Sequence, residues 1–254
     1  MPESTVSKTP LSEAQEDYLK QILLLGSGAE GAGTLADTLA VTTQNLADEI
    51  QVKPASVTGM LKKLSELGLV EYEAYRGVRL TEAGYKVALE VLRHHRLLEA
   101  YLHQALGYGW EEVHAEAERL EHHISEAFEQ RIAEWLGHPT HDPHGDAIPS
   151  AALELPQSAP QRRLVALEAG EYGLVARVAT QDQDSLNLFA HLGLKPGARV
   201  EVLEHAPDGT RVRVGTERYL LPASLAQVLW VSLMGDSYVG DFGDAEGRNP
   251  KAKG

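Results

Sequence analysis

Residues 43–81 read TQNLADEIQVKPASVTGMLKKLSELGLVEYEAYRGVRLT. Thr43 opens a short amphipathic helix, QVK forms a turn, and Pro54 begins a second helix, because proline is favoured at the first helical position. Gly68 ends that helix as a C-terminal cap. The next residues alternate in polarity and turn at Arg76-Gly77, which predicts a hairpin. Two short helices and a hairpin in this order predict a winged helix-turn-helix, a module that binds DNA. The alternative is another kind of small α+β subdomain.

The charge of the chain bears on this interpretation. Its 254 residues carry a formal net charge of -14, which taken alone argues against nucleic-acid binding. Residues 51–65, however, contain three lysines and no acidic residue, and the hairpin adds two arginines. Hydroxyl side chains near the start of the second helix can reach bases or phosphates. Each lysine could equally belong to a solvated helix face. The candidate DNA contacts are Lys53, Ser56, Thr58, Lys62, Lys63, Arg76 and Arg79.

Composition excludes several other classes. No run of about 18 apolar residues is present, so we expect no membrane span. The first ten residues are polar, so we expect no secretory signal. Cysteine is absent, which rules out disulfides and thiolate metal sites and fits a reducing compartment.

The flanking segments predict an α+β chain of several domains. Residues 12–25 predict a helix in which Ser12 and Gln15 form a capping box, followed by a loop, GSGAEGAG. Residues 81–105 and 111–136 predict two long helices. The segment from His138 to Pro160 is rich in Pro, His, Asp and Ser, which is typical of a linker. Residues 162–231 alternate as short strands with turns at Pro196-Gly197 and Pro207-Asp208-Gly209, and so predict a small β-barrel. The predicted boundaries are 1–80 for DNA binding, 81–149 for the helical domain, 150–161 for the linker, 162–231 for the barrel and 232–254 for a disordered tail.

Histidines cluster in the helical region. Nine of the eleven lie between His94 and His144. Beside the apolar stripe predicted for helix 111–136 (Val113, Ala117, Leu120, Ile124, Phe128, Trp135) runs a second row: His114, Glu118, Glu121, His122 and Ser125. The preceding helix offers His95 and Glu99 at i and i+4. Two adjacent helices with such pairs can enclose a divalent cation. Nitrogen and oxygen donors suit manganese, ferrous iron, zinc, cobalt or nickel. The alternative is a solvated acidic face with incidental histidines.

Several motifs carry a family resemblance. They are EDYLKQI (16–22), VKPASVTGMLKKLSELGLVEYEAYRGVRLTEAG (52–84), HHRLLEAYL (94–102) and VHAEAERLEHHIS (113–125). In order and spacing they resemble the metal-dependent repressors typified by the diphtheria toxin repressor and the manganese transport regulator. The resemblance covers residues 12–149, and LKPGARVEVL (194–203) looks like the SH3-like domain of longer members.

The resemblance implies two metal sites. The principal site falls on Asp17, Glu118, Glu121 and His122, and the ancillary site on His95, Glu99 and His114. Iron-type members carry sulfur-containing residues at the positions of Asp17 and Glu118, so the carboxylates here favour Mn²⁺ over Fe²⁺.

Two departures from the family pattern matter. Lys20 stands where manganese-type members carry a second acidic ligand, so we expect separate sites and no bridged metal pair. When metal is absent, Lys20 can pair with Glu118 or Glu121. Asp182 and Ser185 stand where the SH3-like domain supplies ligands in iron-type members, and Asp184 can substitute.

The implied function is that of a cytoplasmic transcription regulator without enzyme activity or membrane association. A homodimer would bind a palindromic double-stranded DNA operator when Mn²⁺ or Fe²⁺ is bound. The base-reading position falls on Gly59, so DNA shape and backbone contacts should supply much of the specificity. Three alternatives stay open: a winged-helix regulator that senses a non-metal ligand, a carboxylate-bridged di-metal enzyme using Glu111-x-x-His114, and a protein-binding module in the β-rich region.

Overall fold

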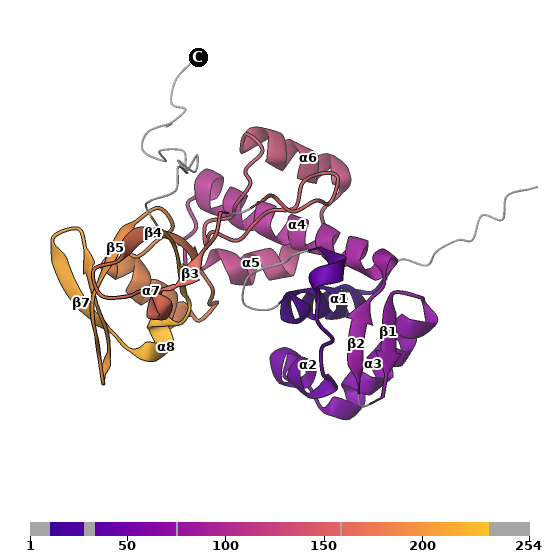
Figure 1. Cartoon of the computed structure of the whole chain (residues 1–254). Coiled ribbons are helices and arrows are strands. Elements are labelled where there is room, and N and C mark those ends of the chain that lie inside the picture. Colours follow the sequence, from indigo (N-terminus) through magenta and orange to yellow (C-terminus); the bar gives the residue numbers. More distant parts are fainter. Residues whose placement is uncertain (1–10, 28–33, 75, 158, 234–254) are drawn as a thin grey trace, which may run out of the picture. The chain divides into compact units, whose positions relative to one another are not determined.

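A computed structural model describes residues 11–27, 34–74, 76–157 and 159–233 (Figure 1). The chain divides into two compact units. One contains the residues up to Ser158 together with Thr180–Asn187, and the other contains Ala159–Ala179 and the residues from Leu188 onward. The polar first ten residues, most of the GSGAEGAG loop and all but two residues of the predicted tail lie outside the described residues. Within the described ranges, no helix is long and apolar enough to cross a membrane.

The first unit begins with the predicted winged helix-turn-helix, which is confirmed. Its elements are α1 (Glu13–Gly26), η1 (Leu35–Asp37), α2 (Thr43–Ile50), α3 (Pro54–Glu66), β1 (Val70–Glu73) and β2 (Gly77–Leu80). The Ser12–Gln15 capping box is present, and Pro54 occupies the first turn of α3. Apolar side chains of α1, α2, α3 and the hairpin form one core.

The hairpin depends on Gly77. Glu73 pairs with Gly77 across the turn, and Gly77 has a φ of +95°. A Cβ at this position would lie 2.5 Å from the carbonyl oxygen of Val41. This close approach lets Val41 and Val78 exchange two backbone hydrogen bonds of 2.9 and 2.8 Å, which attach the hairpin to the segment before α2.

The long helix α4 (Glu82–Leu106) joins two cores. Thr81 caps it by accepting from the Gly84 N–H at 3.1 Å. Ala88 and Leu89, near its start, pack in the core of the winged helix-turn-helix. Leu98 and Leu102, further along, pack with α5 (Val113–Leu120) and α6 (Glu126–Trp135). One helix therefore connects the winged helix-turn-helix to the helical core formed with α5 and α6.

The prediction of a single helix over residues 111–136 is wrong. The helix stops at Leu120, and α6 starts at Glu126, where Ser125 accepts a hydrogen bond of 3.3 Å from the Phe128 N–H. A serine that caps a new helix interrupts the old one, because its side chain replaces a missing backbone partner. The break rotates α6, so Phe128 and Trp135 are exposed instead of continuing the predicted apolar stripe.

The linker prediction is also wrong over its first half. Residues 138–149 are packed against α4, and Asp142, His144 and Ile148 are buried. Arg93 donates to the Pro149 carbonyl at 2.6 Å, and Arg96 donates to the Ala147 carbonyl. The composition of this segment is typical of a solvated linker, but its residues instead provide hydrogen-bond partners for buried charged side chains of α4.

The second unit is a six-stranded antiparallel sheet with strand order β3-β8-β4-β5-β6-β7. Its strands are β3 (Arg162–Arg163), β4 (Tyr172–Val178), β5 (Arg199–Ala206), β6 (Gly209–Val214), β7 (Glu217–Leu221) and β8 (Leu229–Leu233), with η2 (Leu164–Ala166) and α8 (Ala223–Ala226). The predicted turn at residues 207–208 is confirmed, since Ala206 pairs with Gly209.

The prediction of strands throughout residues 162–231 fails over α7 (Gln183–Leu192). Leu186 and Phe189 of α7 are buried at helical spacing. Asp182 begins this helix by accepting from the Ser185 N–H at 2.9 Å and the Ser185 hydroxyl at 2.6 Å. These hydrogen bonds lower the pKa of Asp182. The capping role shows what Asp182 and Ser185 do locally, and their contribution to a metal site stays a prediction.

Candidate metal centre and DNA-binding surface

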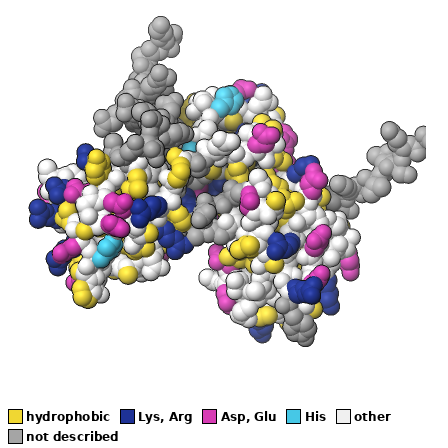
Figure 2. All heavy atoms as spheres, viewed as in Figure 1, with side chains coloured by type: hydrophobic (Ala, Val, Ile, Leu, Met, Phe, Trp, Pro, Cys, Tyr) yellow, Lys and Arg dark blue, Asp and Glu magenta, His cyan; other side chains and the backbone are white. Residues whose placement is uncertain are grey.

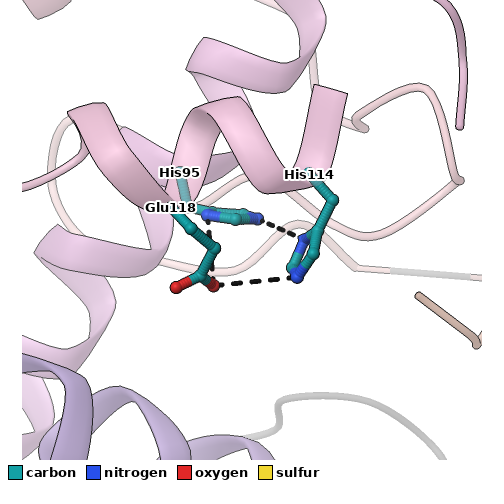
Figure 3. A group of neighbouring side chains, drawn as sticks. All are labelled: His95, His114 and Glu118. Carbon is teal, nitrogen blue, oxygen red and sulfur yellow. Dashed lines mark hydrogen bonds and ion pairs between the residues drawn. The ribbon is translucent and has the colours of Figure 1, made fainter. Parts of the chain in front are cut away.

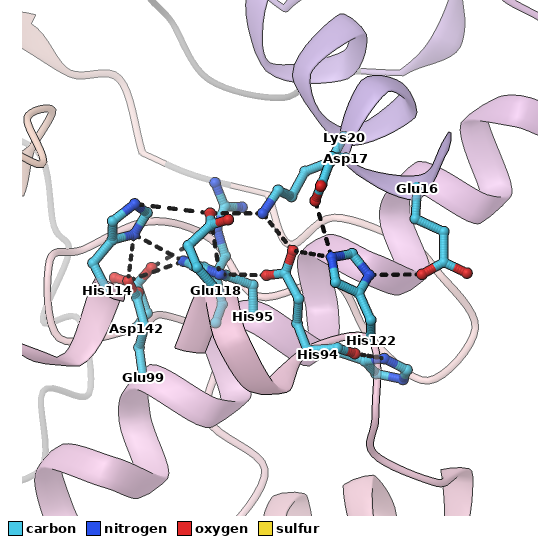
Figure 4. A network of polar contacts seen from close by, with 12 residues as sticks. Glu16, Asp17, Lys20, His94, His95, Glu99, His114, Glu118, His122 and Asp142 are labelled. Carbon is cyan, nitrogen blue, oxygen red and sulfur yellow. Dashed lines mark hydrogen bonds and ion pairs between the residues drawn. The ribbon is translucent and has the colours of Figure 1, made fainter. Parts of the chain in front are cut away.

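A buried polar network joins α1, α4, α5 and the turn that follows α5 (Figure 4). The ammonium of Lys20, on α1, donates to Glu118 Oε1 at 2.7 Å and to Glu121 Oε1 at 2.5 Å. Lys20 is only 2% exposed and Glu121 only 1%. Burial opposes the charge of Lys20, but the carboxylates of Glu121 and Glu118 outweigh burial and raise its pKa. The two carboxylates thus converge on a cation inside the protein.

His95 connects this pair to a second group of ligand atoms on α4 and α5. Its Nδ1 donates to Glu121 Oε2 at 2.5 Å, and its Nε2 donates to Glu99 Oε1 at 3.1 Å. Burial opposes a charge on His95, but Glu99 and Glu121 prevail and raise its pKa to about 9. A metal ion bound by this ring would have to replace a proton.

His114 and Glu118 face His95 from α5 (Figure 3). His114 Nδ1 lies 3.0 Å from His95 Nε2 and 3.1 Å from Glu99 Oε1. Glu118 Oε1 is 3.8 Å from His95 Nδ1 and from His114 Nε2. His95, His114 and Glu118 can each offer one ligand atom within 4.8 Å of the others.

His122 lies in the turn after α5 and faces α1. Its Nε2 donates to Asp17 Oδ1 at 2.9 Å, and its Nδ1 donates to Glu16 Oε2 at 2.7 Å. Burial raises the pKa of Asp17, although His122 and Lys20 partly counter it. Asp17, Glu121 and His122 form a second group whose ligand atoms lie within 4.8 Å of one another. Glu121 is the C-cap residue of α5 and His122 follows it, so both of these ligands lie at the end of that helix.

All seven predicted metal ligands therefore lie in one connected network. The grouping differs in two respects from the set that the resemblance implies. Glu118 lies with His95 and His114, while Lys20 links it to Glu121, and Glu99 forms a group with Asp142 and His144.

Sequence reasoning missed several members of this region. The sequence pattern singles out neither Glu16, beside Asp17, nor Asp142 and His144, which lie in a segment whose composition is typical of a linker. The excess of histidines up to His144 was the available signal for the latter two. A further group combines His94 with Glu90 of α4 and Glu126 of α6.

The predicted DNA contacts lie at the α3 and hairpin end of the first unit, where Figure 2 shows Lys and Arg side chains at the surface. Lys53, Ser56, Lys62 and Lys63 are exposed. A Cβ at Gly59 would meet no atom within 4 Å, so the backbone there is open to a ligand.

The remaining predicted contacts already have partners. Thr58 donates its hydroxyl to the Pro54 carbonyl at 3.1 Å. Arg76 pairs with Glu73 at 3.1 Å, and Arg79 donates to the Thr38 carbonyl at 2.6 Å.

Comparison with known families decides the identity of the chain. Residues 10–78 match the iron-dependent repressor N-terminal DNA-binding domain, and residues 81–150 match the metal-binding and dimerisation domain of that family. The iron-dependent repressor IdeR of Mycobacterium tuberculosis is 35% identical over 200 residues, which span 73% of this chain and 86% of the relative. The chain belongs to the iron-dependent repressor family. It is thus a metal-dependent, dimeric DNA-binding regulator and not an enzyme.

Other relatives agree with this assignment. The regulator MntR of Lysinibacillus sphaericus is 34% identical over 121 residues, covering 48% of this chain and 80% of the relative. A manganese-dependent transcriptional repressor solved with manganese superposes with a TM-score of 0.77 at 36% identity, covering 87% of this chain and 100% of the other. ScaR with bound zinc superposes with a TM-score of 0.70 at 32% identity, covering 86% and 98% of the two chains. Residues 162–233 match the FeoA domain, in agreement with the predicted SH3-like fold.

The Lys20 pair yields a stability prediction. Lys20→Met removes the buried ammonium and leaves the Glu121 carboxylate without one of its two cationic partners. We expect the free energy of unfolding in EDTA to fall by about 3 kcal/mol, the low end for breaking a buried pair, because His95 still donates to Glu121. Denaturant unfolding measures the change.

Lys86→Met is the matched control. Lys86 pairs with Glu82 on an exposed face of α4 at 2.8 Å, and such solvent-screened pairs contribute little to stability. Equal effects of the two substitutions would contradict a buried cation site at Lys20.

Proposed function

We propose that this family member is a cytoplasmic, manganese-activated transcription regulator that binds a palindromic operator as a homodimer. The observation that carries the proposal is the convergence of Asp17 from α1 with Glu121 and His122 from the turn after α5. A metal held there would connect the DNA-binding module to the dimerisation domain.

The donor set supports Mn²⁺ as the activating ion. All candidate ligands are carboxylate oxygens or imidazole nitrogens, and carboxylates suit Mn²⁺ better than softer ions. The structural relative at 36% identity is named a manganese-dependent repressor. Ferrous iron is the runner-up, because the IdeR relative is named iron-dependent.

The residues present fit a divalent cation. Lys20 Nζ lies 2.5 Å from Glu121 Oε1 and 2.7 Å from Glu118 Oε1, so these carboxylates already surround a positive charge. Asp17, Glu118, Glu121 and His122 would hold the principal ion, and His95, Glu99 and His114 the ancillary one. A bound divalent ion would carry two units of positive charge, one more than the ammonium of Lys20, and would favour ligands in defined directions.

The proposed mechanism is a shift in population. α1 packs in the winged helix-turn-helix core and carries Asp17, whereas Glu121 and His122 follow α5. An arrangement that brings Asp17 to Glu121 and His122 binds the ion more tightly than one that does not, so the ion favours that arrangement. In the dimer, two copies of α3 would then lie about 34 Å apart, or a multiple of that, along the DNA.

The first test removes one proposed ligand. His122→Ala should leave a folded dimer whose DNA affinity no longer rises when Mn²⁺ is added, since Asp17 loses its partner across the site. A gel-shift titration on the protein's own upstream DNA measures the affinity with each metal. His123→Ala is the control, because the neighbouring His123 is 60% exposed and its Nε2 lies 3.5 Å from Oε1 of the similarly exposed Glu13.

Either of two results would contradict the assignment. His122→Ala could respond to Mn²⁺ like the unmodified chain, which would place the site elsewhere. The unmodified chain could bind DNA equally with and without metal, which would favour a regulator that senses a different ligand.

The second test concerns the DNA-binding surface. Lys62→Ala and Lys63→Ala should each weaken binding to specific and random DNA about equally, because phosphate contacts carry no sequence information. The slope of log affinity against log salt should become about one unit shallower in each variant. Arg119→Ala is the control: it removes an exposed positive charge from α5 and should leave the salt slope unchanged. If Lys62→Ala also left the slope unchanged, Lys62 would lie away from the DNA.

The third test concerns the number of ions. With Lys20 between Glu118 and Glu121, we expect two separate Mn²⁺ sites per chain and no pair about 3.5–4 Å apart. Anomalous diffraction from manganese-soaked crystals locates the ions. Lys20→Glu replaces the competing ammonium with a carboxylate and should raise the Mn²⁺ stoichiometry or cooperativity at the principal site. Two peaks at bridged spacing in the unmodified chain would overturn the expectation.

A further inference from the structure

The loop after α6 brings a buried histidine to the back of the proposed ancillary site. His144 is 0% exposed, and its Nδ1 lies 3.5 Å from Glu99 Oε2. The other oxygen of Glu99, Oε1, faces His95 Nε2 and His114 Nδ1 at 3.1 Å each. Glu99 therefore divides its oxygens between the proposed metal ligands on one side and His144 on the other.

The position of His144 is fixed from several directions. Its Nε2 donates to the Trp110 carbonyl at 3.0 Å, and its backbone N–H donates to Asp142 Oδ1 at 2.8 Å. The Trp110 ring lies beside the imidazole, with centroids 5.0 Å apart, and donates to the Pro143 carbonyl at 2.8 Å. These contacts fix the imidazole of His144 so that its Nδ1 faces Glu99.

That nitrogen has no hydrogen bond of its own among the described residues. Nε2 must carry a proton, because a backbone carbonyl only accepts. Nδ1 is then the ring atom left to interact with Glu99. A buried polar atom without a full partner is unusual and calls for a reason.

We propose that His144 is a positioning residue for the ancillary metal site: it holds Oε2 of Glu99 so that Oε1 points toward His95 and His114. This inference rests on the proposed function, because it assumes that those residues bind metal. Residues that orient metal ligands commonly change metal affinity about 10–100-fold when they are replaced. The loop from residue 138 to residue 149 would then support the site by holding His144 against Glu99.

Two conservative substitutions separate positioning from packing. The side-chain amide of His144→Asn can take the place of Nδ1 and still donate to Glu99. The amide of His144→Gln reaches the place of Nε2 and keeps the Trp110 contact instead. A purely structural role through Trp110 would be preserved by Gln, whereas positioning of Glu99 would be preserved by Asn.

The measurement uses the full-length dimer with His122→Ala as background, so that Mn²⁺ binding reports the ancillary site alone. We expect isothermal titration to show affinity about 10–100-fold weaker with Gln and within about threefold of the background with Asn. If the Gln variant binds Mn²⁺ as tightly as the background, or if Asn and Gln weaken Mn²⁺ binding equally, the positioning role of His144 is overturned. The proposed ancillary site itself would still stand. Absence of ancillary binding in the background itself would overturn both this inference and the proposed ancillary site.

A second measurement needs no substitution in the loop. NMR of the unmodified, nitrogen-labelled protein with NMR-active cadmium reports which histidine nitrogens coordinate the ion. We expect couplings from the ion to His95 and His114 and none to His144. A coupling to His144 Nδ1 would show that His144 is itself a ligand and would overturn the positioning role.

Discussion

The structure depends on the need to pair charges inside one helix. Ten consecutive residues of α4, Val91–Ala100, are buried, and half of them are ionisable. An unpaired charge in such a place is strongly unfavourable. Each therefore meets a partner from another segment: Arg93 meets Glu129, Arg96 lies near Asp142 and Asp146, His94 meets Glu129, His95 meets Glu121, and Glu99 meets His114 and His144. The turn after α5, α6 and the loop after it are placed by these pairs as well as by apolar packing.

Local signals were sufficient to predict the winged helix-turn-helix. Pro54, Gly68 and Gly77 each act through the backbone conformation that they allow, so their effect can be inferred from neighbouring residues alone. The break at Ser125 could not be predicted in this way. The apolar spacing continues across it, and a serine within such a spacing does not by itself show that it caps a new helix, as Ser125 does in the structure.

The candidate metal site also combines features that the sequence predicts with features that only the folded structure shows. Its seven proposed ligands could be identified from spacing and family resemblance, because five of them lie on α1, α4 and α5 and the other two directly follow α5 in a recognisable order. Which ligand faces which could not, since Glu118 lies with His95 only through the packing of α5 on α4. His144 was missed for a related reason: its polar neighbours are typical of a solvated linker, and only the charges of α4 make their burial favourable.

Lys20 connects α1 to the two carboxylates that the proposed metal ion would also bind. Lys20 and Asp17 are three residues apart on α1, so both reach the same region after α5. On the proposed function, the ammonium of Lys20 and the metal ion compete for Glu118 and Glu121, and α1 stays connected to these carboxylates in either case. The ion differs in also attracting Asp17 and His122, which the ammonium does not bridge. Metal would then hold α1 through Asp17 as a ligand in a fixed direction, instead of through the flexible side chain of Lys20, and that difference is what the DNA-binding module can transmit.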